Sequence, residues 1–212
     1  MTYALGLGDA LAGFATVAIA GPWKNKPTIL EFYILPEYRS RAFDFFEAFL
    51  AESGARLMEI QSSDLVLAAM LHTYCREVSS EAIVFRDGVT TALPANGAVL
   101  KPLTSDRVVR RAIAERAGGP EWRLLVDGKT AGKGGILFHY NAPYGDVYME
   151  IEEPFRGRGF GAYLVQELKR CAYEIESIPA ARCNVDNQSS RKTLQKAGFV
   201  PYAHVLNGTI RG

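Results

Sequence analysis

The feature that most constrains this chain is a glycine-rich stretch, PFRGRGFGAYL, at residues 154–164. Glycines stand at positions 157, 159 and 161, and arginines stand at positions 156 and 158. Glycine lets the backbone turn tightly, adopt positive φ angles and approach a ligand with no side chain in the way. Because a strand-like pattern precedes the stretch and a helical pattern follows it, the sequence predicts a tight turn from strand to helix here.

Strand patterns lead up to this turn. Two apolar runs within residues 122–140 flank Asp127-Gly128, which is a strong signal for a β-hairpin. Residues 146–153, DVYMEIEE, follow as a third strand. Because strand side chains alternate between faces, Glu150 and Glu152 are expected on one face and Ile151 on the other.

The pattern after the turn is helical and then mixed. Apolar residues at helical spacing predict a helix over about residues 159–176. A short strand at 180–185 comes next, followed by a helix opened by Asn187 and stopped by Gly198. Residues 199–206 read as a final strand.

The first part of the chain repeats this order in a weaker form. Residues 37–46, EYRSRAFDFF, keep both arginines and the first phenylalanine of the glycine-rich stretch but none of its glycines. Gln-Ser-Ser recurs at 61–63 and at 188–190. Because the similar pieces occur in the same order, we predict an internal duplication. The predicted domains are a truncated lobe at residues 1–93 and a complete domain at residues 98–212.

Composition and charge exclude several classes of protein. The chain has 212 residues, of which 48% are apolar, and its 24 basic and 23 acidic residues give a net charge of +1. This balance leaves no electrostatic footprint for nucleic acid or an anionic membrane. No apolar run reaches the length of about 20 residues that spans a bilayer, and no basic residue precedes Lys24, as a secretory signal would require.

The cysteines indicate neither a metal site nor a set of disulfides. Cys75, Cys171 and Cys183 lie far apart without the spacing of a zinc site or a disulfide framework. The sequence therefore predicts a cytoplasmic protein that contains no metal and binds neither nucleic acid nor membrane.

The glycine-rich turn is expected to hold an anion. Free N–H groups at a helix N-terminus, together with the helix dipole, favour a phosphate or pyrophosphate, and Arg156 and Arg158 can add charge-assisted hydrogen bonds. No Lys-Ser or Lys-Thr follows, as a P-loop requires, and the spacing G-x-G-x-G differs from the dinucleotide fingerprint G-x-G-x-x-G. A turn without any ligand is the structural alternative.

Two motifs together resemble a known family. Residues 156–161, RGRGFG, resemble the R/Q-x-x-G-x-G/A signature of the GNAT superfamily of acyl-CoA-dependent N-acetyltransferases, and Ile151 matches the aliphatic strand position that accompanies it. The family's second marker, N-x-x-A/S-x-x-L-x-x-K-x-G-F, is matched at five positions, with Thr193 where leucine is usual. The matching residues are Asn187, Ser190, Lys196, Gly198 and Phe199. The resemblance covers about residues 98–207.

The resemblance implies an α/β (α+β) protein with the GNAT acyl-CoA N-acyltransferase fold. Its mixed, mostly antiparallel sheet has splayed fourth and fifth strands with acetyl-CoA, the co-substrate, between them, and the fold is duplicated as a degenerate first lobe and a complete second one. Ala42 and Asp44 stand where Gly159 and Gly161 stand in the second copy, so the first copy is expected not to bind coenzyme A. The cofactor-binding residues that the resemblance implies are Ile151, Arg156, Gly157, Arg158, Gly159, Phe160, Gly161, Asn187 and Ser190.

The implied reaction is attack of an amine on the acetyl thioester. Glu150, ahead of Glu152, is the candidate general base, because a carboxylate near apolar neighbours can have its pKa raised toward the working range. Both can equally be solvated strand carboxylates. Backbone N–H groups around Ile151 are the candidate oxyanion donors.

One position departs from the family pattern. Leu194 stands where many members have a tyrosine that protonates the departing thiolate, and Tyr202 and His204 are weaker candidates for that role. His139, Tyr140 and Tyr144 are candidates for lining the acceptor pocket, with a simple turn as the alternative reading.

Two functions follow from these residues. The first is an N-acetyltransferase that acts on a primary amine of a small molecule or peptide, and the glutamates favour it. The alternative is a noncatalytic acyl-CoA-binding module with a regulatory or partner-binding role, which Leu194 favours. The acceptor and the oligomeric state, including a homodimer, are left open by the sequence.

Overall fold

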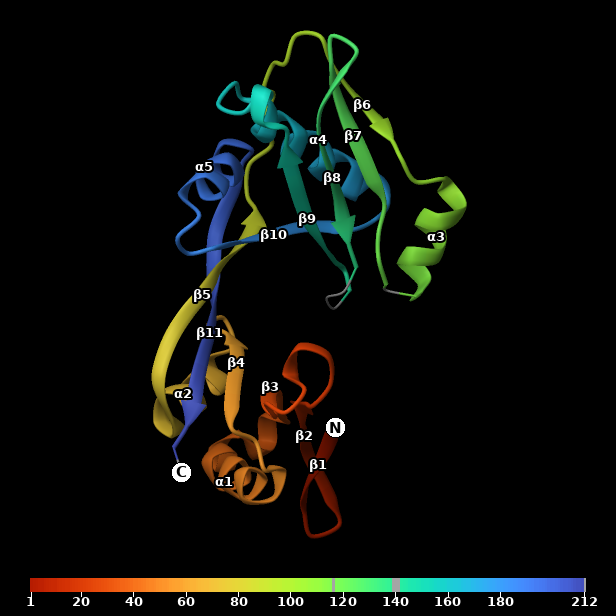
Figure 1. Ribbon diagram of the computed structural model, residues 1–212. Helices are drawn as coiled ribbons and strands as arrows, with labels where there is room; N and C mark the ends of the chain where they lie inside the picture. The colour runs from red at the N-terminus through yellow and green to blue at the C-terminus, as the bar shows by residue number, and fades with distance from the viewer. Residues whose placement is uncertain (116, 139–141, 212) are drawn as a thin grey trace. The chain divides into compact units, whose positions relative to one another are not determined.

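The computed structural model describes residues 1–115, 117–138 and 142–211, so His139 and Tyr140 lie outside the described residues. The chain divides into two compact units, Met1–Ala82 with Ala203–Gly212, and Ile83–Tyr202. Two long strands, β5 (Cys75–Asp87) and β11 (Phe199–Ile210), pass from one unit into the other (Figure 1). The domain boundaries predicted at residues 93 and 98 stay a prediction.

The first unit is a sheet with two helices. Its strands follow the order β1-β2-β3-β4-β11-β5, and only β3 and β4 pair in parallel among the pairings that the structure describes. Its core is rich in contacts between aromatic rings, with Phe32 and Phe46 in edge-to-face contact at 4.9 Å between centroids. Its own elements are β1 (Thr2–Leu7), β2 (Ala10–Ala18), η1 (Gly21–Trp23), β3 (Thr28–Ile34), η2 (Pro36–Arg41), α1 (Ala42–Ser53), β4 (Leu57–Gln61) and α2 (Leu65–Tyr74).

The second unit has the same kind of sheet with three helices. Its strands follow the order β5-β10-β9-β8-β7-β6, and β9 and β10 form the parallel pair. Its own elements are β6 (Ala98–Pro102), α3 (Asp106–Glu115), β7 (Glu121–Val126), β8 (Lys129–Leu137), β9 (Tyr144–Ile151), η3 (Glu153–Phe155), α4 (Phe160–Glu174), β10 (Ile178–Asn184) and α5 (Gln188–Lys196). The predicted hairpin is present between β7 and β8, where Asp127 and Gly128 have φ angles of 49° and 78°.

The strands β9 and β10 splay apart. Their parallel register covers Tyr144 to Asp146 of β9, opposite Ile178 to Ala180 of β10. On its other edge, β9 is paired with β8 as far as Ile151. The C-terminal half of β9 therefore keeps one hydrogen-bonded neighbour, and the edge that faces β10 is open, as the GNAT resemblance implies.

The two units repeat the same element order in their local details. Apart from η1 between β2 and β3, the series β1-β2-β3-η2-α1-β4-α2-β5 matches β7-β8-β9-η3-α4-β10-α5-β11. In each copy an arginine five residues after the strand returns to its last carbonyl: Arg39 Nε donates to Ile34 O at 3.4 Å, and Arg156 Nε donates to Ile151 O at 2.9 Å. Such matched contacts support the predicted duplication.

Candidate functional site

The glycine loop connects η3 to α4 and has the backbone conformation that its sequence predicts. Gly157 and Gly159 have φ angles of 73° and 88°, where side chains are strained. A Cβ built onto Gly157 would meet nothing within 4 Å, so this side of the loop is open. A Cβ on Gly161 would lie 3.3 Å from the Thr193 Cγ2, because helix α5 packs against the start of α4 here.

The loop presents unpaired donors. Gly159 is the N-cap of α4, makes no side-chain cap, and is followed by no acidic residue in the first turn. The first N–H groups of a helix have no intrahelical partner. Over the stretches that the structure describes, no other group accepts from the N–H groups of residues 157–161. Converging N–H groups and the helix dipole make this loop a site for an anion.

The two arginines of the loop have different roles. Arg156 ties the loop to the end of β9 through its bond to Ile151 O. The Arg158 guanidinium lies over the rings of Phe155 and Phe160, at 5.7 and 5.2 Å from their centroids. Neither forms an ion pair with any carboxylate in the described part of the chain, so both keep positive charge at the loop.

The corresponding loop of the first unit lacks these properties. Residues 36–41 form the 3-10 helix η2 with no positive φ angle, and Ala42 is already helical, with φ −57°. Asp44 supplies a carboxylate in the first turn of α1 and lies 3.0 Å from the Arg41 Nε. The first turn of α1 therefore carries an acid that repels an external anion, which supports the prediction that this copy binds no cofactor.

The candidate bases lie on the strand beside the loop. Glu150 is exposed, with its Oε2 3.6 Å from the Lys133 Nζ of β8, and Glu152 is exposed as well. On the same face, the Tyr148 hydroxyl donates to Glu121, and burial and that carboxylate raise the pKa of the Tyr148 phenol. The face of β9 that bears Glu150 is thus lined by paired polar groups.

Asp146 is a further acidic residue on this face, which the sequence analysis did not select. Its side chain is 10% exposed and lies 3.5 Å from the Arg182 Nε of β10. Burial raises the pKa of the Asp146 carboxyl to about 6, although the Arg182 charge opposes the shift. Asp146 belongs to the last pair of β9 with β10, where the two strands begin to separate. The signal in the sequence was an acid in an apolar strand, at even spacing from Glu150.

The remaining predicted residues fall into separate places. Asn187 caps α5, since its Oδ1 accepts from the Ser190 N at 2.9 Å. Leu194 is buried in the core of the second unit. Tyr202 is exposed beneath the Arg86 guanidinium, whereas His204 belongs to the first unit, where its ring contacts the Ser80 hydroxyl. Tyr144 is exposed at the start of β9.

The cysteines are packing residues. All three thiols are buried. Burial raises the pKa of Cys75 and of Cys171 to about 11, which disfavours the reactive thiolate.

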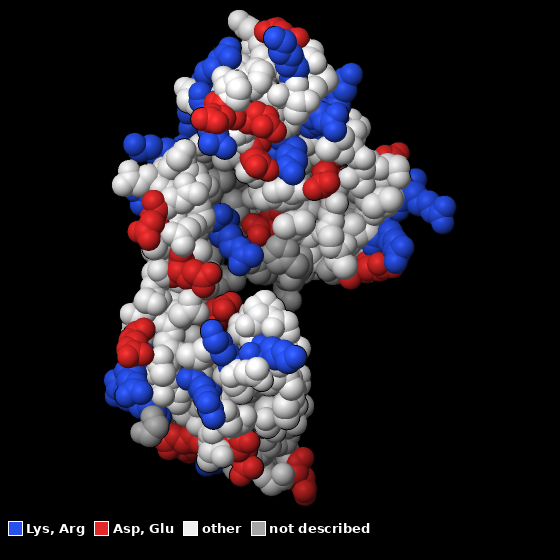
Figure 2. Space-filling view, viewed as in Figure 1, with Lys and Arg blue, Asp and Glu red and all other residues white. Residues whose placement is uncertain are grey.

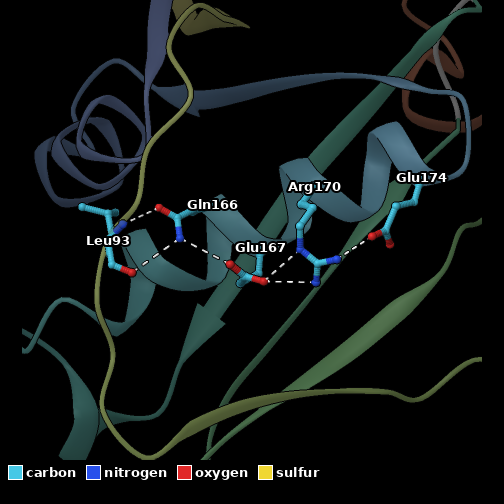
Figure 3. A network of polar contacts seen from close by, with 5 residues as sticks. All are labelled: Leu93, Gln166, Glu167, Arg170 and Glu174. Atoms are coloured by element: carbon cyan, nitrogen blue, oxygen red, sulfur yellow. Dashed lines mark hydrogen bonds and ion pairs between the residues drawn. The ribbon is translucent and has the colours of Figure 1, made fainter.

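A surface cavity of about 450 Å³ lies along α4, lined by its second half and by the segment after β5, and by none of the loop residues. Figure 3 shows part of its wall, where Arg170 lies between Glu167 and Glu174. To the left of them in Figure 3, Leu93 N donates to the Gln166 Oε1 at 2.7 Å. Because these polar groups already pair with one another, we place the functional site at the loop rather than in this cavity.

The described residues offer neither a metal site nor a membrane-spanning helix. Within the described ranges, no group of three or more His, Cys, Asp or Glu residues could hold a metal ion. No helix in the described chain is both long and apolar enough to cross a membrane. On the face shown in Figure 2, basic and acidic side chains are interspersed.

Comparisons with known proteins agree with this geometry. Residues 140–206 match the family model described as FR47-like protein. The chain is similar to an acetyltransferase of the GNAT family from Colwellia psychrerythraea, with a TM-score of 0.75 at 15% identity over 99% of this chain and 85% of that one. It is also similar to a tandem GNAT protein from the clavulanic acid biosynthesis pathway, with a TM-score of 0.62 at 14% identity over 100% and 83% of the two chains. No curated protein matches it.

These findings establish the fold. The family match includes the glycine loop and α5, and the similar structures cover nearly the whole chain. The resemblance to the GNAT superfamily is confirmed, and so is the mixed, mostly antiparallel α/β fold. The tandem form with a degenerate first copy stays a prediction.

Proposed function

We propose that the protein is an acyl-CoA-dependent N-acetyltransferase, which moves an acetyl group from acetyl-CoA to a primary amine of a small molecule or peptide. The observation that carries this proposal is the loop at residues 157–161, whose unpaired N–H groups meet at a helix N-terminus without an internal acid. The fold that the chain shares with proteins described as GNAT acetyltransferases supports it. The tandem organisation belongs to the proposal, with the first unit as a copy that binds no cofactor.

The residues present fit coenzyme A. The N–H groups of Gly157 to Gly161 would hold the pyrophosphate, and Arg156 and Arg158 would add positive charge. The open edge of β9 leaves backbone groups for the pantetheine arm. Bound acetyl-CoA supplies the activated acyl group.

Backbone donors for the developing oxyanion come from β9. Because Glu152 N donates to Ala131 O of β8, the alternation along the strand directs the N–H groups of Met149 and Ile151 to the open edge. The Ile151 carbonyl on this edge is already occupied by Arg156. Fixed N–H donors stabilise the charge that develops on a carbonyl oxygen without reorganisation.

A carboxylate on β9 would take the proton from the amine. Glu150 and Glu152 are the proposed bases, with Glu150 the stronger candidate. Asp146 is a second candidate, because it is buried beside the point where the strands separate. Leu194 stands at the position of the usual acid, so the coenzyme A thiolate would leave without a proton from a tyrosine. A thiol with a pKa of about 8.5 is a sufficiently good leaving group for this.

The alternative function is a noncatalytic acyl-CoA-binding module. The exposure of Glu150 and its ion pair with Lys133 favour this alternative, since they describe a solvated strand carboxylate. Both functions need the same loop, so binding alone does not separate them. Only turnover of an amine does.

Replacing Glu150 tests the choice between them. If Glu150 is the general base, Glu150→Gln lowers kcat by about 100-fold and leaves the affinity for acetyl-CoA unchanged, because the carboxylate does not contact the loop. The measurement is release of free thiol over a panel of amines, beside calorimetric titration. Glu176→Gln, which removes the same charge from an exposed position after α4, is the matched control. Equal rates in both variants would remove Glu150 from the mechanism.

The raised pKa of Asp146 predicts a pH-dependent stability. The folded state keeps the Asp146 proton up to about pH 6, whereas the ordinary pKa of an aspartate side chain is 3.8. This group therefore contributes stability at low pH that is lost as the pH rises through about 6. Asp146→Asn should flatten this part of the profile. Urea unfolding of both proteins at pH 4.5 and 7.5 measures it, and parallel profiles would contradict the prediction.

A further inference from the structure

Lys196 is an unpaired cation at the positive end of helix α4. A Cβ built onto Gly159 would lie 4.0 Å from the Lys196 Nζ. The side chain is exposed, and none of the described residues forms a hydrogen bond or ion pair with it. A cation beside helix N–H groups is electrostatically unfavourable, because this end of the dipole favours negative charge. An anion between the two would reverse the sign of this interaction.

Packing holds the lysine in this place. Thr193 and Lys196 are three residues apart on α5 and so lie on neighbouring turns of one face. Thr193 contacts the start of α4 near Gly161. The next residue after Lys196 is fixed as well, because the buried Lys169 Nζ donates to Ala197 O at 2.9 Å. The position of Lys196 is therefore set by both helices.

The first unit provides an internal comparison. Asp64 caps α2 as Asn187 caps α5, each accepting at 2.9 Å from the N–H three residues on. Counted from these caps, Thr73 stands where Lys196 stands. The copy whose loop has an acid at its helix N-terminus, Asp44, thus lacks the lysine, and the copy without the acid has it.

Lys196 also has a simpler role to be separated from ligand binding. It lies in the last turn of α5, where a cation is favoured by the negative end of that helix. That role stabilises the fold and predicts no effect on affinity. This stabilising role does not explain why the Lys196 ammonium lies close to the glycine loop.

We propose that Lys196 is a ligand-binding residue, whose ammonium pairs with the pyrophosphate held by the amides of the glycine loop. This inference rests on the proposed function. It adds a third cation from a separate helix to the two arginines of the loop. A mobile point charge such as lysine suits phosphate oxygens that the fixed amides leave unpaired.

The test compares Lys196→Gln with wild type by calorimetric titration of coenzyme A and of its analogue without the 3′-phosphate. Removing one charge-assisted contact is expected to weaken both ligands equally, by about 10- to 100-fold. Lys101→Gln is the matched control, since it removes the same charge from an exposed position on β6, three strands away from β9. It should bind both ligands as wild type does.

The outcomes separate this inference from the proposed function. If wild type binds neither ligand, the proposed function fails. If wild type binds and Lys196→Gln binds equally well, only the role of Lys196 is overturned. If Lys196→Gln loses affinity for coenzyme A alone, Lys196 contacts the 3′-phosphate instead of the pyrophosphate. If Lys101→Gln loses as much affinity as Lys196→Gln, the effect is one of net charge. Either result contradicts the proposal. If Lys196→Gln lowers the melting temperature but leaves the affinity unchanged, Lys196 only stabilises the C-terminal end of α5 and does not bind the ligand.

Discussion

Gly159→Asp is expected to abolish binding of acetyl-CoA, with a loss of more than about 100-fold in affinity. Wild type should bind one molecule per chain. The new carboxylate would stand at the N-cap of α4, where it repels phosphate and competes for the same N–H groups. The substitution copies the first unit, where Asp44 already occupies the start of α1.

Two control variants separate charge from backbone strain. Gly159→Asn has the same shape and the same strain at φ 88° but no charge, so it should bind more tightly than Gly159→Asp. Gly118→Asp adds the same charge at φ 67° in open space, away from the loop, and should bind as wild type does. Titration calorimetry of the four proteins, with circular dichroism to verify folding, gives the result.

The result bears on both candidate functions. Saturable binding that Gly159→Asp removes would support the cofactor site and the division of labour between the copies. Absence of binding by wild type would sink both the transferase and the acyl-CoA-binding module. The loop would then be only a structural turn, which connects a strand to a helix and binds no ligand.

Local features of the fold could be predicted from the sequence. The hairpin at Asp127-Gly128 and the helix after the glycine loop follow from short-range rules, since positive φ angles and helical periodicity are written in neighbouring residues. The predicted helix at 159–176 is observed as Phe160–Glu174. The splayed strands came from the family resemblance, because no local pattern encodes where two strands separate.

Long-range features could not be predicted in the same way. The strand β5 was not identified, because its pairing depends on residues far along the chain in β11 and β10. The burial of Asp146 and the approach of Lys196 to Gly159 also depend on tertiary packing. For the same reason, the sequence favoured Glu150 as base, although the structure shows it exposed beside Lys133.

Loss of Lys169 should strongly destabilise the second unit. Its side chain is 6% exposed, although it carries a charge. The Nζ lies 2.5 Å from the Asp87 Oδ1 and donates to Val89 O and Ala197 O at 2.8 and 2.9 Å. This ammonium thus joins α4, the end of β5 and the end of α5, the helix that bears Lys196.

Lys169→Met is expected to lower the free energy of unfolding by about 3–5 kcal/mol, because it leaves the Asp87 carboxylate buried without a countercharge. The Tyr173 hydroxyl, which donates to the Asp87 Oδ2 at 2.8 Å, is not charged and cannot replace the lysine. Lys169→Met combined with Asp87→Asn should recover part of the loss, since the uncompensated charge is then gone.

The neighbouring Arg170 provides the matched control. Its side chain is 57% exposed, and its guanidinium pairs with Glu167 and Glu174 on the surface of α4 (Figure 3). Arg170→Met should therefore cost no more than about 1 kcal/mol, as exposed ion pairs usually contribute little. Urea unfolding of the two variants measures the contrast. Equal losses would mean that burial of Lys169 and Asp87 does not govern the stability of this unit. A large loss of unfolding free energy in Lys169→Met alone would show that the packing of α5 against α4 and β5 depends on one buried charge pair.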